Sequence, residues 1–385
     1  MSKLSKDSVV GVIGAGTMGS GIAQLAATSG HNVVLYDSFT GASAKAVERI
    51  RTTLEGLVKK GKINEAGLNT ILSKIKVANS LNDFAPCGLI IEAVIEELEI
   101  KKDLFRKLEA VCEPSAILAT NTSSISVTSI AAACKGSGRV MGVHFFNPAP
   151  VMPLVEIIPG LATDNAMLKE VTELIQSWGK TTVQAKDTPG FIVNRVARPF
   201  YGEAIRIYEE GIAHYADIDW AIKEIGGFRM GPFELMDFIG NDVNYMVTET
   251  VWKQMFFDPR YKPSITQKRL SEAGYFGRKT GKGYYDYSEN AAQPQLSKDM
   301  ESGKQVFMRI ISMLINEAYE ALYYKIATRE DLETAMTKGV NYPKGLLAWG
   351  NELGLKNVLN TLENLYETYK EERYRPGLLL KQSAK

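Results

Sequence analysis

The sequence predicts an α/β domain built on a doubly wound parallel sheet, followed by two tandem all-helical domains. Strand-like apolar runs alternate with helical patterns over roughly the first 185 residues, which is typical of a parallel sheet with helices on both faces. From residue 191 onward the pattern is helical, and it repeats itself once. We expect the sheet domain to span residues 1–186 and the helical domains to span residues 187–290 and 299–385.

The chain opens with a strand–helix–strand pattern. Val9–Ile13 is a β-branched run that ends at Gly14, and helical spacing then continues over residues 18–29. Gly30 fits the position that follows a helix, and Val33–Tyr36 is a second apolar strand. The pattern predicts two neighbouring parallel strands joined by a helix.

The rest of the sheet domain alternates in the same way. Residues 43–76 form a long, charged amphipathic stretch that the breaker Gly61 divides, so we expect a helical hairpin there. Strand-like apolar runs follow at residues 88–93, 116–119 and Val140–Phe145, with helical patterns between them. These runs predict further strands of the parallel sheet.

Breaks in the pattern divide the helical half of the chain. Residues 186–190 form a linker or turn, and the polar, breaker-rich residues 274–294 separate two helical pieces. Four pairs of identical residues in the two pieces are 114 residues apart: Glu203 and Glu317, Asp217 and Asp331, Gly231 and Gly345, Gly240 and Gly354. A constant separation predicts that one helical domain has been duplicated.

The composition excludes several classes of protein. The 45 basic and 44 acidic residues give a net charge of +1, which provides no bulk attraction to nucleic acid or to an anionic membrane. No apolar run reaches the roughly 20 residues that a membrane helix needs, and the polar N-terminus resembles neither a signal nor a transit peptide. The three cysteines and three histidines show no metal-binding or redox spacing. We expect a cytoplasmic protein with no metal, no nucleic-acid partner and no membrane.

A glycine-rich motif lies between the first strand and the first helix. Its GxGxxG spacing allows a tight turn at Gly14, approach of a pyrophosphate to the backbone at Gly16, and close helix–strand packing at Gly19. The pyrophosphate then meets the positive end of the helix. The motif predicts a Rossmann-type dinucleotide site, whose loop residues are Gly14, Gly16, Thr17, Met18 and Gly19.

Asp37, at the end of the second strand, predicts which dinucleotide binds. It lies 23 residues after Gly14, where its carboxylate can accept hydrogen bonds from the ribose hydroxyls. The same charge would repel the 2′-phosphate of NADP. We therefore expect the cofactor to be NAD.

Polar residues interrupt three apolar runs further along the chain. They are the segment 121–124, which reads Asn-Thr-Ser-Ser, then His144 and Glu156. A buried, ionised Glu needs a partner, and a proline-rich connection could bring His144 and Glu156 side by side. In such a pair the carboxylate fixes the imidazole tautomer and stabilises the imidazolium. His144 could then take a hydroxyl proton near neutral pH.

These motifs are similar to those of the L-3-hydroxyacyl-CoA dehydrogenases. The similar motifs are the His144–Glu156 pair, residues 121–124, residues 188–195 (TPGFIVNR) and residues 276–285 (FGRKTGKGYY). They follow the order and spacing of the family over roughly residues 8–288, and the likeness is weaker beyond. The resemblance implies NAD-dependent oxidation of (3S)-3-hydroxyacyl-CoA to 3-oxoacyl-CoA. It also implies helical domains like the C-terminal domain of 6-phosphogluconate dehydrogenase.

The resemblance implies a role for each candidate catalytic residue. His144 would be the general base that removes the 3-hydroxyl proton while hydride leaves C3, and Glu156 would orient it. Ser123 and Asn194 would hydrogen-bond the substrate oxygens and the catalytic histidine. General-base assistance of this kind is worth roughly 10²- to 10⁴-fold in rate.

The resemblance also implies contacts with NAD and with coenzyme A. On the nicotinamide side of NAD it implies Glu96, Lys101, Ser123, Asn147 and Lys279. On the coenzyme A side it implies Thr53, where the family has serine, and Lys60. Lysines of this hairpin could attract phosphates, although the cluster also fits a solvated helix face. We expect short acyl chains, as in 3-hydroxybutyryl-CoA and acetoacetyl-CoA, and a place in fatty acid metabolism such as β-oxidation.

The second helical copy lacks one candidate catalytic residue. At the 114-residue separation Asn194 falls on Met308, whereas Arg195 falls on Arg309. The resemblance implies that this domain forms a homodimer interface in single-copy relatives. We therefore expect residues 299–385 to form an internal pseudo-dimer that replaces a partner subunit, with a homodimer as the alternative.

Two other functions fit part of the pattern. A hydroxyacid or gulonate-type dehydrogenase shares the His–Glu arrangement, and the basic hairpin with Lys60 favours a CoA thioester only modestly. The other candidate is a non-catalytic NAD-binding protein like the related lens crystallins. Retention of all four candidate catalytic residues argues against it.

Overall fold

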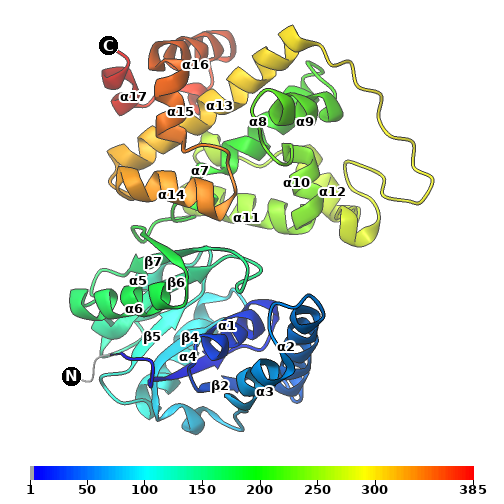
Figure 1. Cartoon of the computed structure of the whole chain (residues 1–385). Helices are drawn as coiled ribbons and strands as arrows, with labels where there is room; N and C mark the ends of the chain where they lie inside the picture. Colours follow the sequence, from blue (N-terminus) through cyan, green and yellow to red (C-terminus); the bar gives the residue numbers. More distant parts are fainter. Residues whose placement is uncertain (1–3) are drawn as a thin grey trace. The chain divides into compact units, whose positions relative to one another are not determined.

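The computed structural model describes residues 4–385 and divides the chain into two compact units (Figure 1). Unit 1, Met1–Phe191, contains an eight-stranded sheet, and unit 2, Ile192–Lys385, is built from helices. An α/β unit followed by an all-helical unit confirms the predicted fold class. Among the described residues, no helix is both long enough and apolar enough to cross a membrane.

The sheet of unit 1 has the strand order β3-β2-β1-β4-β5-β6-β7-β8. Neighbours run parallel except for β6 and β7, which are antiparallel. The strands are β1 (Val9–Ile13), β2 (Val33–Tyr36), β3 (Ile75–Val77), β4 (Cys87–Glu92), β5 (Ile117–Thr120), β6 (Val140–Phe145), β7 (Leu154–Pro159) and β8 (Thr181–Gln184). The predicted parallel sheet is therefore present, with one reversal of direction between β6 and β7.

Helices cover both faces of this sheet. On one face lie α1 (Thr17–Thr28), α2 (Ala42–Lys59), α3 (Glu65–Ser73) and α6 (Asn165–Ser177), and on the other lie α4 (Leu98–Val111) and α5 (Val127–Ala131). Successive residues of β4 serve both cores, because Leu89 and Ile91 join the first and Ile90 joins the second. Burial on both faces explains why the central strands read as continuous apolar runs.

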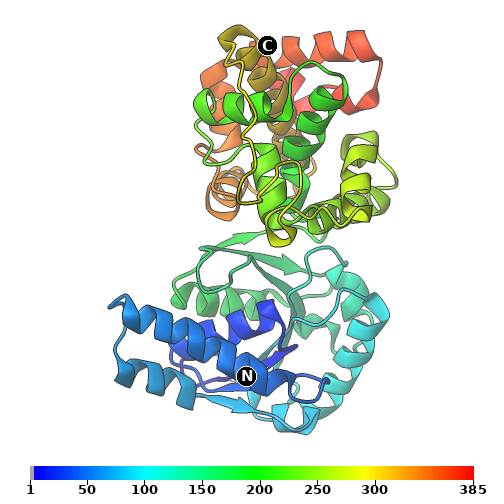
Figure 2. The same ribbon diagram turned by 90° about the vertical axis from the view of Figure 1, so that its right-hand side faces the viewer.

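The helical hairpin predicted over residues 43–76 is present as α2 and α3, which lie side by side (Figure 2). Gly61 has a φ of +66° between them, and the Asn64 side chain caps α3 by accepting a hydrogen bond from Gly67 N. The prediction was wrong at its C-terminal end, where the chain leaves the helix at Ser73 and forms edge strand β3. Strand β8 was not predicted.

Unit 2 repeats a pattern of helices. Its helices are α7 (Val193–Val196), α8 (Arg198–Glu209), α9 (Tyr215–Glu224), α10 (Pro232–Ile239), α11 (Asn241–Gln254), α12 (Ile265–Glu272), α13 (Met300–Tyr323), α14 (Arg329–Gly339), α15 (Leu346–Leu353), α16 (Leu355–Tyr369) and α17 (Leu378–Ser383). The first residues of α9, α10 and α11 precede those of α14, α15 and α16 by 114 residues each. This is the separation found between the sequence repeats.

The two copies differ at their first helix. In the first copy α7 ends at Val196, and α8 begins with Arg198 and Pro199. Proline lacks the N–H that a preceding turn needs, so it fits the start of a helix and not its interior. In the second copy Met313 corresponds to Pro199, and α13 continues through it without a break.

Candidate active site

The GxGxxG loop connects β1 to α1. Gly14 has a φ of +95°, and a Cβ at Gly19 would lie 1.7 Å from the Gly14 carbonyl oxygen, so both positions require glycine. Gly16 differs, because no described heavy atom beyond Gly16 itself and its two chain neighbours lies within 4 Å of a Cβ built there. Its backbone is open to a ligand at the N-terminus of α1, where Thr17 is exposed and Met18 partly exposed. The loop therefore fits a pyrophosphate.

Two side chains hold the backbone of this loop at Ala15. Asp37 Oδ2 accepts a hydrogen bond from Ala15 N at 2.7 Å, and Arg49 Nη2 donates one to Ala15 O at 2.5 Å. Asp37 thus lies beside the loop at the end of β2, where the ribose hydroxyls of a dinucleotide would meet it. Arg49 was not predicted, because on the exposed side of α2 it is indistinguishable in sequence from a solvated charge.

Several candidate residues of unit 1 follow the carboxyl ends of its strands. Five parallel strands, β1, β2, β4, β5 and β6, are followed in turn by the glycine-rich loop, Asp37, Glu96, Ser123 and Asn147. The carboxyl ends of parallel strands share one edge, and open α/β sheets bind ligands there. Asn147 is exposed at this edge. The fold therefore brings the predicted cofactor residues of unit 1 to a common edge.

His144 and Glu156 form a buried pair across β6 and β7. They face each other in the antiparallel register, and His144 Nδ1 lies 2.7 Å from Glu156 Oε2. His144 is 5% exposed and Glu156 0%. An ionised carboxylate can only accept, so Nδ1 donates and Nε2 is the nitrogen left to take a proton. The rings of Phe146 and Phe191 flank the imidazole, with centroids 4.6 and 5.8 Å from its own.

Glu96 organises the loop that follows β5. Its Oε1 accepts hydrogen bonds from Ser123 N at 2.9 Å, Ser124 N at 3.2 Å and Thr122 Oγ1 at 2.5 Å. Lys101 Nζ lies 3.1 Å from its Oε2. The Glu96 side chain is 33% exposed, and its partial burial opposes ionisation, but the charge of Lys101 and the donated hydrogen bonds outweigh this effect, so the pKa of Glu96 lies below its ordinary value. The ionised Glu96 thereby fixes the backbone at Ser123.

Lys101 lies almost wholly inside unit 1. It is 1% exposed, and its Nζ lies 2.6 Å from Oε1 of Glu92, which is 0% exposed. Glu92 also accepts hydrogen bonds from Thr120 Oγ1 and Val94 N, both at 2.7 Å. Glu92 was not predicted, because it ends its apolar strand, whereas Glu156 interrupts the middle of one.

Thr53 lies on the exposed side of α2. An open hollow of about 770 Å³ on this side is lined by Ala44, Lys45, Glu48, Arg49, Thr52 and Thr53. Lys45, Arg49 and Thr53 follow at four-residue intervals, which places them on one face of the helix. Lys60 is exposed at the C-terminal end of the same helix. The hollow thus carries basic and hydroxyl groups, and Arg49 links it to the glycine-rich loop.

Asn194 and Lys279 belong to unit 2. Asn194 is partly exposed on α7, and its carbonyl oxygen accepts a hydrogen bond from Arg198 Nε at 2.8 Å. Lys279 Nζ lies 2.6 Å from Asp242 Oδ2 and 5.0 Å from the centroid of the Phe276 ring. These contacts within unit 2 do not test the roles predicted for either residue, which stay predictions.

Two family models match the chain. The model described as "3-hydroxyacyl-CoA dehydrogenase, NAD binding domain" matches residues 9–188. The model described as "3-hydroxyacyl-CoA dehydrogenase, C-terminal domain" matches residues 190–287 and again residues 306–385. The chain belongs to the 3-hydroxyacyl-CoA dehydrogenase family. It is an NAD-dependent oxidoreductase, and the predictions of the family and of NAD as the cofactor are confirmed.

Relatives of this dehydrogenase match it over both units. The 3-hydroxyadipyl-CoA dehydrogenase of Escherichia coli is 39% identical over 97% of each chain. The 3-hydroxybutyryl-CoA dehydrogenase of Bradyrhizobium diazoefficiens is 42% identical and covers 72% of this chain and 94% of its own length. The crystal structure of 3-hydroxybutyryl-CoA dehydrogenase from E. coli K12 has a TM-score of 0.92 and 38% identity, over 99% of this dehydrogenase and 98% of that chain.

Proposed function

We propose that this dehydrogenase oxidises short-chain (3S)-3-hydroxyacyl-CoA to 3-oxoacyl-CoA, and catalyses the reverse reduction, with His144 as the general base. The observation that carries the proposal is the buried His144–Glu156 pair, with 2.7 Å between Nδ1 and Oε2, on the dinucleotide-binding sheet. Oxidation of an alcohol releases a proton with the hydride, and an oriented imidazole is suited to take that proton. Names of relatives that contain 3-hydroxybutyryl-CoA support the short acyl chain.

The proposed mechanism divides the work between cofactor and protein. NAD, when bound, supplies the hydride acceptor, and the protein supplies placement and proton transfer. Glu156 keeps the hydrogen on Nδ1 of His144, so Nε2 presents its lone pair to the substrate 3-hydroxyl. As the proton arrives, the carboxylate of Glu156 stabilises the imidazolium in a buried site, where charge interactions are strong. Ser123 and Asn194 hydrogen-bond the substrate oxygens.

The same proposal assigns the cofactor and substrate contacts. Gly16 and the N-terminus of α1 hold the pyrophosphate of NAD, and Asp37 holds a ribose. Glu96, Asn147 and Lys279 serve the nicotinamide side, and the buried Lys101 supports Glu96. Thr53 and Lys60 serve coenzyme A, along the hollow on α2.

A test replaces the proposed base. His144→Ala is expected to lower kcat for NADH-dependent reduction of acetoacetyl-CoA by roughly 10²- to 10⁴-fold, with NADH affinity unchanged. Glu156→Gln should lower the rate and change its pH profile. His214→Ala is the control, because this imidazole is exposed and caps α9. Near-normal turnover by His144→Ala, or faster reduction of a free 3-oxo acid than of acetoacetyl-CoA by the unmodified enzyme, would contradict the proposal.

We also propose that the second helical copy takes the place of a partner subunit. The same family model matches both copies, and their helices begin at a constant separation. A domain that packs against its own duplicate buries the surface that a dimer would bury. A cytoplasmic location also stays a prediction.

A further inference from the structure

Asn194 lies on a helix that is too short to fix its own orientation. α7 has four residues, Val193–Val196, and a single turn contributes few hydrogen bonds of its own. Its position therefore depends on packing and on anchored side chains. α7 packs most closely against α13 of the second copy, and also against α14 of the second copy and α8 and α11 of the first. Its residue Arg195, next to Asn194, is 4% exposed.

Glu317 of α13 anchors this arginine. Arg195 Nε lies 2.7 Å from Glu317 Oε1, and Tyr261 Oη donates a hydrogen bond to the same oxygen. Glu317 is 2% exposed, and Arg260 Nη1 lies 3.6 Å from its Oε2. A buried guanidinium without a counter-charge is strongly unfavourable, so the position of Glu317 determines the position of the Arg195 guanidinium. Because Arg195 belongs to α7, this pair fixes the rotation of the helix that carries Asn194.

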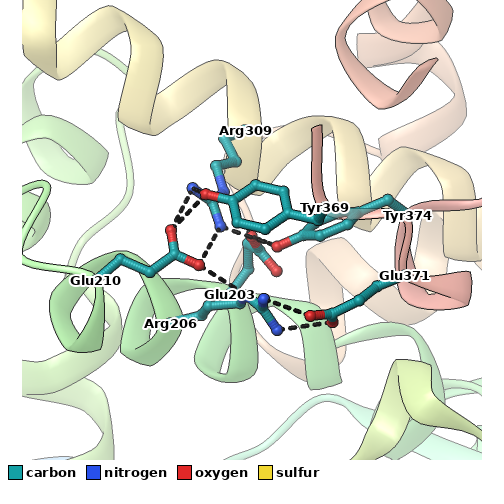
Figure 3. A network of polar contacts seen from close by, with 7 residues as sticks. All are labelled: Glu203, Arg206, Glu210, Arg309, Tyr369, Glu371 and Tyr374. Atoms are coloured by element: carbon teal, nitrogen blue, oxygen red, sulfur yellow. Dashed lines mark hydrogen bonds and ion pairs between the residues drawn. The ribbon is translucent and has the colours of Figure 1, made fainter. Parts of the chain in front are cut away.

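The same arrangement occurs a second time with the copies exchanged, as Figure 3 shows. Arg309 Nε donates to Glu203 Oε1 at 2.6 Å, and Tyr374 Oη donates to the same oxygen at 2.8 Å. Arg309 and Glu203 correspond to Arg195 and Glu317 at the 114-residue separation. The residue before Arg309 is Met308, which has no polar group to offer a substrate. Both copies therefore contain a buried Arg–Glu pair, to which Glu210 adds a second carboxylate on the Arg309 side, and only the Arg195 pair adjoins a proposed substrate contact.

We propose that Glu317, from the second helical copy, is a positioning residue for the reaction and acts through Arg195 to place Asn194. The inference rests on the proposed function, and specifically on the contact of Asn194 with the substrate. It gives the second copy a part in the chemistry in addition to its part in folding.

The test compares the two matched glutamates in the full-length enzyme. Glu317→Gln removes the counter-charge of Arg195 and is expected to lower kcat for acetoacetyl-CoA reduction by roughly 10- to 100-fold, the size of effect that small misplacements produce. Its KM for NADH should change little. Glu203→Gln removes the corresponding charge beside Met308, where Arg309 still keeps Glu210, and should lower the midpoint of thermal unfolding by less, with kcat within about twofold of the unmodified enzyme. Equal kcat values for the two variants would overturn the proposal.

A double mutant shows whether Glu317 acts through Asn194. With Asn194→Ala in place, Glu317→Gln should have little further effect on kcat, because residues that act as one unit are non-additive. An undiminished effect would overturn the positioning role. If Asn194→Ala alone keeps full kcat, the substrate contact proposed for Asn194 is the part that fails. If Glu317→Gln does not fold, Arg195→Lys and Arg309→Lys give the same comparison, since lysine keeps the charge and loses the guanidinium geometry.

Discussion

The three glycines of the GxGxxG loop differ in what a side chain would meet. A Cβ at Gly14 would lie 2.4 Å from the Ala93 carbonyl oxygen, and one at Gly19 would lie 1.7 Å from the Gly14 oxygen. Both contacts are with backbone, which cannot move aside cheaply. Beyond Gly16 itself and its chain neighbours, no described heavy atom lies within 4 Å of a Cβ at Gly16, whose φ of −69° suits any residue. Folding therefore requires glycine at the first and third positions, and we expect the proposed cofactor contact to be the reason for glycine at the second.

Two alanine variants separate these requirements. Gly16→Ala should fold with an unchanged unfolding midpoint and raise KM for NADH by about tenfold or more, equivalent to roughly 1.4 kcal/mol of lost binding. Gly19→Ala should be destabilised by at least about 1–3 kcal/mol, the usual range for overpacking. Thermal unfolding and steady-state kinetics on both variants check this. An unchanged KM in Gly16→Ala would show that the cofactor does not approach this backbone.

At the scale of elements, the loops after β4 and β5 are joined by one carboxylate. Glu96 accepts hydrogen bonds from three residues of the second loop and is paired with Lys101 of α4. The position of Ser123, a proposed substrate contact, thus depends on a loop residue 27 positions earlier in the chain. A change at Glu96 should affect both stability and the position of this loop.

The free energy of unfolding at low pH should depend on the Glu96 carboxylate. The pKa of Glu96 is lower in the folded chain than its ordinary value of 4.5, so its contribution to stability is present above about pH 4.5 and disappears as the pH falls through the folded pKa. Glu96→Gln should lower the midpoint of thermal unfolding at pH 7. Below pH 4.5 the midpoint of this variant should fall less steeply than that of the unmodified protein. Glu99→Gln is the control, because Glu99 is 76% exposed on α4. Identical pH profiles for the two variants would contradict the assignment.

Whether an element could be predicted from the sequence depends on how that element is buried. The central strands β1, β2, β4, β5 and β6 are apolar runs with clear boundaries and were predicted to within a residue. Strands β3 and β8 lie at the two edges of the sheet, and they are short and partly polar, so no apolar run marks them. The His144–Glu156 pair was predictable because both residues interrupt apolar runs. Burial of Lys101 was not, because lysine is usually exposed and its partner Glu92 lies on another element.

At the scale of the whole chain, the duplicated helices form one compact unit. Two buried arginine–glutamate pairs join the copies, one in each direction. The Arg309 side is extended by Glu210, which accepts from Arg309 and from Tyr369 (Figure 3). Complementary charges of this kind fix how two partner surfaces align.

The proposed pseudo-dimer predicts the mass in solution. Light scattering should give the mass of one chain, and a chain that ends near Asn290 should self-associate or lose solubility, because it leaves Arg195 without Glu317. Size-exclusion chromatography with acetoacetyl-CoA assays checks both chains. The idea fails if the full chain is a dimer, or if the shortened chain is monomeric, soluble and fully active.

The two Arg–Glu pairs between the copies also have a consequence for how the sequence can evolve. In a symmetric dimer one codon sets both sides of the interface, so neither side can change alone. Here Glu203 and Glu317 are encoded separately, and selection can act on each without disturbing the other. Met308 beside Arg309 is an outcome that such independence permits, because Arg309 keeps its pair with Glu203 whether or not residue 308 is polar.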